Sequence, residues 1–180
     1  EVVDQLNVNA VDGLGMAFPG YQDWLTLVGL NGAGVTVAIV DEGVDEAHPD
    51  LAGSWLPCTG ASCTVAPSIH GTHVAGIVTG NGASAVTDAN GFLRGLGVAP
   101  EAKILEQEFI MFRFLPGGVF ELIADSYRNG ATISNNSWGS SVTAKGYNAD
   151  AMMIDVGVRD ADTAEPGNQS MFYVQAIGNG

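Results

Sequence analysis

The sequence predicts a three-layer α/β/α domain built on a mostly parallel β-sheet. Strand-like and helix-like segments alternate along the 180 residues, as in βαβ units with right-handed crossovers. The segment VTVAIV (35–40) is apolar throughout and lacks the polar alternation of a strand that faces water on one side. The chain is 46% hydrophobic and has the length of one ordinary domain, so it can bury both faces of such a strand.

The first part of the chain predicts a helix, a strand and a second helix. Residues 21–30 form a short amphipathic pattern that NGAG (31–34) ends, and the strand 35–40 follows. The apolar positions of HVAGIVTG (73–80) predict the second helix, whose glycines would allow close packing.

The second part continues the alternation. A strand is expected at the start of 102–112, and 117–130 predicts a helix because its apolar period is near 3.6 and Gly130 stands at its end. The remaining elements are expected at 131–134 (strand), 147–163 (helix) and 171–177 (strand).

The charge balance argues against polyanionic partners. Twenty Asp and Glu against six Lys and Arg give a formal net charge of −14, which would repel nucleic acid and anionic membrane surfaces. The sequence contains no apolar run of membrane-spanning length. We therefore expect neither nucleic acid nor membrane as a partner.

The two cysteines, Cys58 and Cys63, lie in the loop PCTGASCT. Their spacing allows a small disulfide loop, which favours a secreted or extracytoplasmic protein; two unpaired thiols are the alternative. The spacing is not C-x-x-C, and no further cysteine completes a zinc site.

Small polar residues follow the apolar strands, and the carboxyl ends of parallel strands share one edge of a sheet, where ligands bind. These residues are Asp41 after 35–40, then Asn135, Asn136 and Ser137, and finally Gly178 and Asn179 after 171–177. His70 stands near a helix start, and helix N-termini face the same edge. The sequence thus predicts one polar site along that edge.

An aspartate, a histidine and an asparagine amide on one edge suit acyl transfer. Asp41 would orient the ring of His70, His70 would act as general base, and Asn179 would donate to a developing oxyanion. Each residue also has a structural alternative: a helix cap or turn for Asp41, a core or capping histidine for His70, and a turn between glycines for Asn179. His73 lies inside the helical pattern and is expected to be a packed histidine.

Four blocks carry a family resemblance: VTVAIVDEGVDEAHPDL (35–51), HGTHVAGIVTG (70–80), NNSWGS (135–140) and QAIGNG (175–180). In this order they resemble the subtilisin-like serine proteases, the subtilases (peptidase family S8), over roughly residues 21–180. The resemblance implies that Asp41 is the triad carboxylate, His70 the triad base and Asn179 the oxyanion-hole side chain.

The same resemblance implies a polypeptide substrate. Ser137, Trp138 and Gly139 align with the edge segment that pairs with substrate backbone and borders the pocket for the residue before the cleaved bond. Trp138 is large for this position, and core packing is its alternative role.

The nucleophile block of the family, of the type Gly-Thr-Ser-Met-Ala, has no counterpart in the sequence. Ser84, in GASAV, lacks the second glycine of a G-x-S-x-G turn. We therefore expect 1–180 to be the N-terminal portion of one catalytic domain, incomplete at its C-terminal side and inactive without the missing part. The last strand, 171–177, would then present an apolar edge that invites pairing with a second copy.

The resemblance also implies a structural calcium ion, since Asp50 matches a family ligand and Asp88 and Asn90 offer further oxygens. No cofactor is expected to be required. A non-catalytic peptide-binding module is the alternative function. A nucleotide-binding domain is disfavoured because the turn after the strand, DEGVDE, is acidic.

Overall fold

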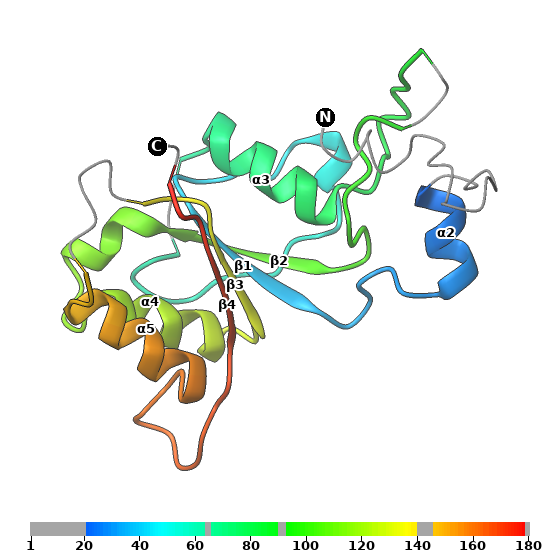
Figure 1. Cartoon of the computed structure of the whole chain (residues 1–180). Coiled ribbons are helices and arrows are strands. Elements are labelled where there is room, and N and C mark those ends of the chain that lie inside the picture. The colour runs from blue at the N-terminus through cyan, green and yellow to red at the C-terminus, as the bar shows by residue number, and fades with distance from the viewer. Residues whose placement is uncertain (1–20, 64–65, 90–92, 140–145, 179–180) are drawn as a thin grey trace.

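The computed structural model describes residues 21–63, 66–89, 93–139 and 146–178. Within them a parallel sheet has the strand order β2-β1-β3-β4 (Figure 1). The strands are β1 (Thr36–Asp41), β2 (Lys103–Glu108), β3 (Ile133–Asn136) and β4 (Phe172–Gln175). All three strand pairings are parallel, as the alternating sequence predicted.

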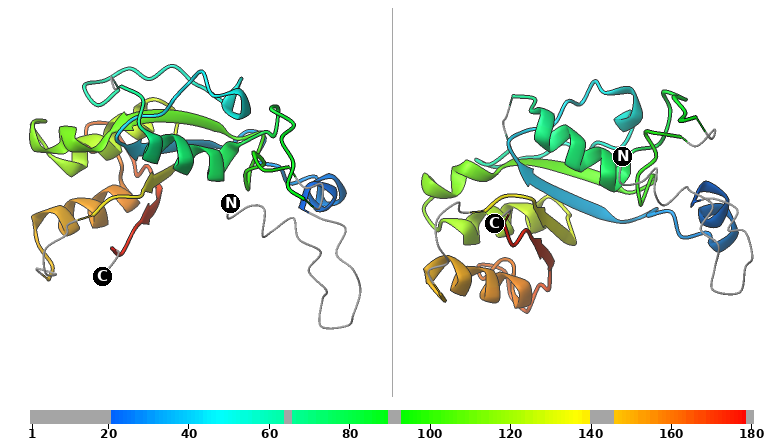
Figure 2. Two further views of the ribbon diagram at one scale, coloured as in Figure 1. Left: turned by 90° about the horizontal axis from the view of Figure 1, so that it is seen from above. Right: turned by 45° about the horizontal axis from the view of Figure 1, so that its top comes forward.

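Helices cover both faces of the sheet and complete the predicted three-layer α/β/α arrangement. They are α2 (Tyr21–Val28), α3 (Ile69–Thr79), α4 (Val119–Arg128) and α5 (Ala149–Arg159), with short 3₁₀ helices at Pro49–Leu51 and Phe109–Arg113. Helix α3 lies on one face, α4 and α5 lie on the other, and α2 lies beyond the end at which β1 begins (Figures 1 and 2). In these described ranges no helix is long and apolar enough to cross a membrane.

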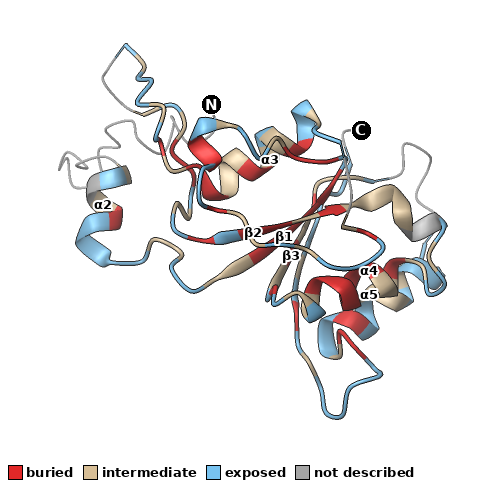
Figure 3. Ribbon diagram, turned by 180° about the vertical axis from the view of Figure 1, so that it is seen from behind, coloured by how far each residue is buried: buried red, intermediate tan, exposed pale blue. Residues whose placement is uncertain are grey.

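The two faces of β1 supply two separate cores. Val37 and Ile39 pack with Ala75 on the α3 side, whereas Ala38 and Val40 pack with residues of α4 on the other side. Buried residues accordingly concentrate along the strands and on the inner sides of α3 and α4 (Figure 3). The uninterrupted apolar run of β1 reflects burial on both faces.

Several element boundaries differ from the sequence predictions. Helix α3 begins at Ile69 rather than at 73 because the Ser68 hydroxyl accepts the His70 N–H at 3.2 Å and caps the helix. Strand β3 begins two residues later than expected, at Ile133, and α5 ends at Arg159 rather than at 163.

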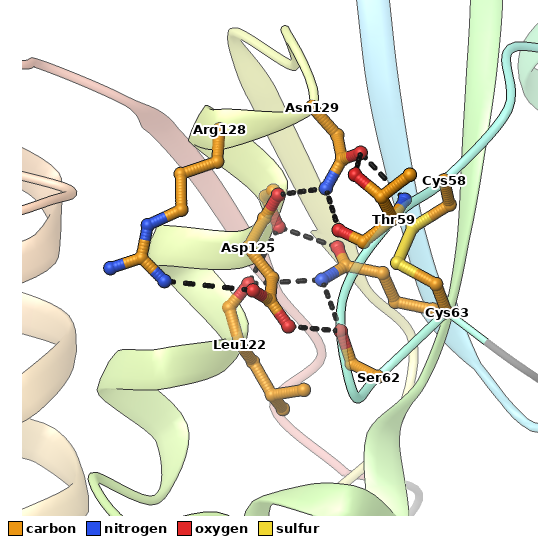
Figure 4. The surroundings of a disulfide bond; sticks show 10 residues. Cys58, Thr59, Ser62, Cys63, Leu122, Asp125, Arg128 and Asn129 are labelled. Atoms are coloured by element: carbon orange, nitrogen blue, oxygen red, sulfur yellow. Dashed lines mark hydrogen bonds and ion pairs between the residues drawn. A yellow bond between two sulfur atoms is a disulfide. The ribbon is translucent and has the colours of Figure 1, made fainter.

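A disulfide joins Cys58 and Cys63, and its loop docks on α4 (Figure 4). The Asn129 side chain accepts the Thr59 N–H at 2.7 Å. The Ser62 hydroxyl donates to the Asp125 carboxylate at 2.9 Å. The loop is therefore held by a covalent bond, by a buried hydrogen bond to α4 and by an exposed one to the residue that caps this helix.

Candidate active site

Asp41 is the last residue of β1 and lies at the carboxyl edge of the sheet. The residues Val37, Ile39 and Asp41 share one strand face, so the Asp41 side chain points toward α3. The residue is 1% exposed. Its Oδ1 accepts the Glu42 N–H at 2.8 Å and lies 2.8 Å from Nδ1 of His70.

His70 is the second residue of α3, and Ser68 caps that helix. Its side chain is 55% exposed, in contrast to the 2% of the Asp41 side chain. A carboxylate only accepts hydrogen bonds, so Nδ1 of His70 carries the proton that it shares with Asp41. Nε2 is then left unprotonated and able to accept a proton, as a general base must.

Two glycines allow α3 to approach the end of β1. A Cβ atom at Gly71 would lie 2.0 Å from the carbonyl oxygen of Gly43 and 3.2 Å from Oδ1 of Asp41. Gly43 has a φ of +114°, and a Cβ there would lie 2.0 Å from the carbonyl oxygen of Ala66. No larger residue fits at either position, and this close contact sets His70 beside Asp41.

The turn after β1 is tied to α3 by a further hydrogen bond. The Thr72 hydroxyl accepts the Asp45 N–H at 2.8 Å and donates to the Ser68 carbonyl at 2.6 Å. The turn, the helix cap and the first turn of α3 therefore form one hydrogen-bonded unit.

Glu106 of β2 lies on the same face as Asp41, and sequence reasoning missed it. Its Oε1 accepts the Val44 N–H at 2.5 Å. Burial raises the pKa of Glu106 to about 7; the Val44 hydrogen bond opposes this, and the charges of Glu46 and Glu108 add to it. The available signal was a carboxylate within the strand that was expected at the start of 102–112.

The predicted substrate segment Ser137–Gly139 directly follows β3. Trp138 is half-buried and stacks on Phe109 with ring centroids 5.2 Å apart, so the packing role considered for it is present. Its carbonyl accepts a hydrogen bond from the Gln175 side chain at 2.5 Å, whereas Gly139 is exposed. Asn179 lies outside the described residues.

Asp50 is buried and bound by the loop that follows α3. Its Oδ1 accepts the Ser84 N–H at 2.7 Å, and its Oδ2 accepts the Ser84 hydroxyl at 3.0 Å. The described residues contain no group of three or more His, Cys, Asp or Glu placed to hold a metal ion. Asn90, offered above as a further oxygen ligand, lies outside the described residues, and calcium binding stays a prediction.

The expectation that His73 is packed was wrong. His73 is exposed and lines a pocket of about 730 Å³ together with Ile69, Ile77 and His48. Helix α3 buries Gly71, Ala75 and Thr79, and His73 lies on the opposite side of the helix, which faces the pocket instead of the core.

Comparison with known proteins identifies the family. The model of the subtilase family (peptidase S8) matches residues 32–180, which include Asp41 and His70. The chain belongs to the subtilase family. This is the family that the sequence blocks resembled.

Two individual subtilases match this chain over 128 and 170 residues. Fervidolysin of Fervidobacterium pennivorans is 34% identical over 128 residues, 61% of this chain and 17% of that protein. Furin of Homo sapiens is 31% identical over 170 residues, 84% of this chain and 20% of furin. The chain thus spans a fifth or less of the length of these two relatives.

Aeromonas sobria provides a structural match. The crystal structure of its serine protease superposes with a TM-score of 0.58 and 25% identity over 84% of this chain and 26% of that one. A relative from the same organism, named Aeromonas extracellular serine protease, is 38% identical over 89 residues, 45% of this chain and 13% of that protein.

Proposed function

We propose that this subtilase chain is the part of a serine endopeptidase that carries the Asp and His of the catalytic triad. The observation that carries the proposal is the 2.8 Å bond between Asp41 Oδ1 and His70 Nδ1, with the carboxylate buried and the ring partly exposed. A buried carboxylate fixes the tautomer of the base and stabilises the imidazolium that forms when the base takes a proton.

The serine nucleophile, in this proposal, comes from sequence beyond residue 180. In the described part of the chain no serine hydroxyl is hydrogen-bonded to the ring of His70, and Ser84 is engaged by Asp50. The family resemblance sets the nucleophile block well after the oxyanion asparagine. Residues 1–180 alone would then lack covalent catalysis.

The proposed reaction follows from these positions. Nε2 of His70 takes the proton of the incoming serine as its oxygen attacks the peptide carbonyl, and it then returns the proton to the leaving amine. Asp41 stays ionised and holds the ring. Asn179 would donate to the oxyanion, and Ser137–Gly139 would pair with the substrate backbone.

Polypeptide is the proposed substrate class, and secretion or export the proposed location. The disulfide between Cys58 and Cys63 suits an oxidising compartment, and one relative is named an extracellular protease. The proton transfers proposed above use only protein side chains, so the proposal requires no cofactor.

Labelling with a fluorophosphonate tests this function in the full-length protein, meaning these residues together with the sequence that follows them. We expect one serine downstream of residue 180 to be labelled, and a His70→Ala variant to label far more slowly because its serine is not activated. Peptide binding without any labelling of the full-length protein would instead indicate a non-catalytic peptide-binding module.

A further inference from the structure

Glu106 is a carboxylate in the sheet on the same side as the proposed catalytic pair. Ile104, on the same face of β2, belongs to the core under α3, and β2 pairs with β1 in a register that sets Glu106 beside Ile39. Asp41 lies two residues beyond Ile39 on that same face of β1. The Glu106 side chain therefore reaches, from the sheet, the turn that comes after Asp41 in the chain.

The bond that Glu106 accepts holds this turn. Val44 is buried, and the N–H of Val44 donates to Glu106 Oε1 at 2.5 Å. A Cβ atom at Gly43 would lie 3.4 Å from the same Oε1, so the carboxylate lies against the turn backbone itself. Within the described residues the Val44 N–H has no other acceptor.

The 42–45 turn supports the first residues of helix α3. The carbonyl oxygen of Gly43 lies where a side chain on Gly71 would have to be, so the two backbones are in direct contact. The Asp45 N–H bonds to Thr72 of the same helix. A shift of the turn would therefore move Gly71 and Thr72, the two residues that directly follow His70.

We propose that Glu106 is a positioning residue that seats the 42–45 turn and thereby sets the distance between Asp41 and His70. It touches neither substrate nor the reacting atoms, and it acts through the backbone of Gly43 and Val44. The inference rests on the proposed function only in that peptide hydrolysis is one of its two readouts.

The test compares Glu106→Ala, which removes the acceptor, with Glu106→Gln, which keeps a side-chain oxygen for the Val44 N–H. In the full-length protein we expect Glu106→Ala to lower kcat roughly ten- to a hundred-fold with little change in KM, because displacement of a catalytic group slows the chemical step. Glu106→Gln should restore most of kcat. Glu101→Ala, which truncates an exposed glutamate just before β2, should behave as wild type.

A second readout does not need activity. The proton that His70 Nδ1 shares with Asp41 should give a far-downfield ¹H NMR resonance in the wild type and in Glu106→Gln. In Glu106→Ala that resonance should shift or broaden. If the alanine variant does not fold, Glu106→Asp replaces it: its carboxylate is retracted by one methylene, and we expect a smaller loss of kcat at unchanged KM.

Two outcomes would overturn the inference. One is a folded Glu106→Ala or Glu106→Asp variant with wild-type kcat and an unshifted His70 resonance. The other is an equal loss of kcat in Glu106→Gln and Glu106→Ala, which would show that the hydrogen bond to Val44 is not what matters. Failure of the proposed function can be told apart from failure of this inference. If the function is wrong, the wild type itself does not hydrolyse peptides, and the NMR comparison still decides the role of Glu106.

Discussion

Asp41 and His70 were predicted from sequence for reasons that hold in the structure. A polar residue directly after a fully apolar strand has to lie at the sheet edge, and Asp41 ends β1 there. His70 precedes an apolar helical pattern, and it lies in the first turn of α3. Both inferences needed only local sequence and the direction of parallel strands.

Glu106 could not be predicted in the same way. Its partner, the Val44 N–H, is 62 residues away in sequence. The contact depends on the register between β1 and β2, which the sequence pattern does not specify. His73 was interpreted wrongly because the apolar pattern of 73–80 does not specify which side of the helix is buried: α3 buries the side of Gly71 and Ala75, and His73 lies opposite.

Glu106 should make stability depend on pH. Its pKa is about 7 in the folded protein, above the ordinary value of 4.5, so the folded state binds the proton more tightly than the unfolded state. Its stabilising contribution is therefore complete below about pH 4.5 and is lost as the pH rises through about 7. Glutamine does not titrate, so we expect the Tm of Glu106→Gln to rise relative to the wild type between these two pH values.

Differential scanning fluorimetry of both proteins from pH 4.5 to pH 8 measures this difference, with Glu101→Gln as an exposed control. A Tm difference that stays constant across that range, or that falls as the pH rises, would contradict the assigned burial of Glu106.

At the scale of elements, α3 shows what the sequence pattern could and could not predict. Its apolar positions predicted a helix, but the first turn, IHGT, contains one exposed isoleucine and a glycine and so carries no apolar signal. The turn exists because Ser68 caps it and because Gly71 fits against Gly43. The period of the apolar residues shows neither this helix cap nor this tertiary contact.

Two glycines of this helix should respond oppositely to alanine. Gly71→Ala forces a Cβ against the Gly43 carbonyl and should cost roughly 1–3 kcal/mol of stability. At Gly76 no atom outside the helix lies within 4 Å of an added Cβ, so Gly76→Ala should stabilise by up to about 1 kcal/mol through helix propensity. Urea unfolding of both variants measures the contrast, and equal effects would show that the Gly71–Gly43 contact is not tight.

At the scale of the whole molecule, the alternation of elements was sufficient to predict parallel strands and three layers. The strand order was not predictable in detail, because right-handed crossovers allow more than one order for the same alternation. The order β2-β1-β3-β4 places β1 inside and leaves β4 at an edge. Strand β3 is internal too but has the sequence ISNN, so it is the burial of β1 in a core on each face that explains its continuous apolar sequence.

The disulfide loop should contribute measurably to stability. Cys58 and Cys63 are five positions apart, and a crosslink of that size is worth about 2 kcal/mol in the chain-entropy account. We expect the Cys58→Ser/Cys63→Ser variant to lose about that much in urea unfolding. Reductant should lower the stability of the wild type to the same level and leave the variant unchanged; a wild type insensitive to reductant would contradict this.

The edge strand β4 should make the 180-residue chain self-associate. Phe172 is 68% exposed and Val174 is 42% exposed on a strand that, among the described residues, pairs on one side only. We expect light scattering to show a concentration-dependent dimer or swapped assembly, and Val174→Lys to weaken it by placing a charge on that edge. A clean monomer at high concentration would count against the prediction.

Peptide hydrolysis by two histidine variants of the full-length protein tests the central claim most directly. His70→Ala removes the proposed base, whereas His73→Ala, three residues along the same helix, removes an exposed ring that does not contact Asp41. We expect His70→Ala to lose kcat on the order of 10⁴-fold or more, and His73→Ala to stay close to wild type. Near-wild-type turnover of His70→Ala would contradict it.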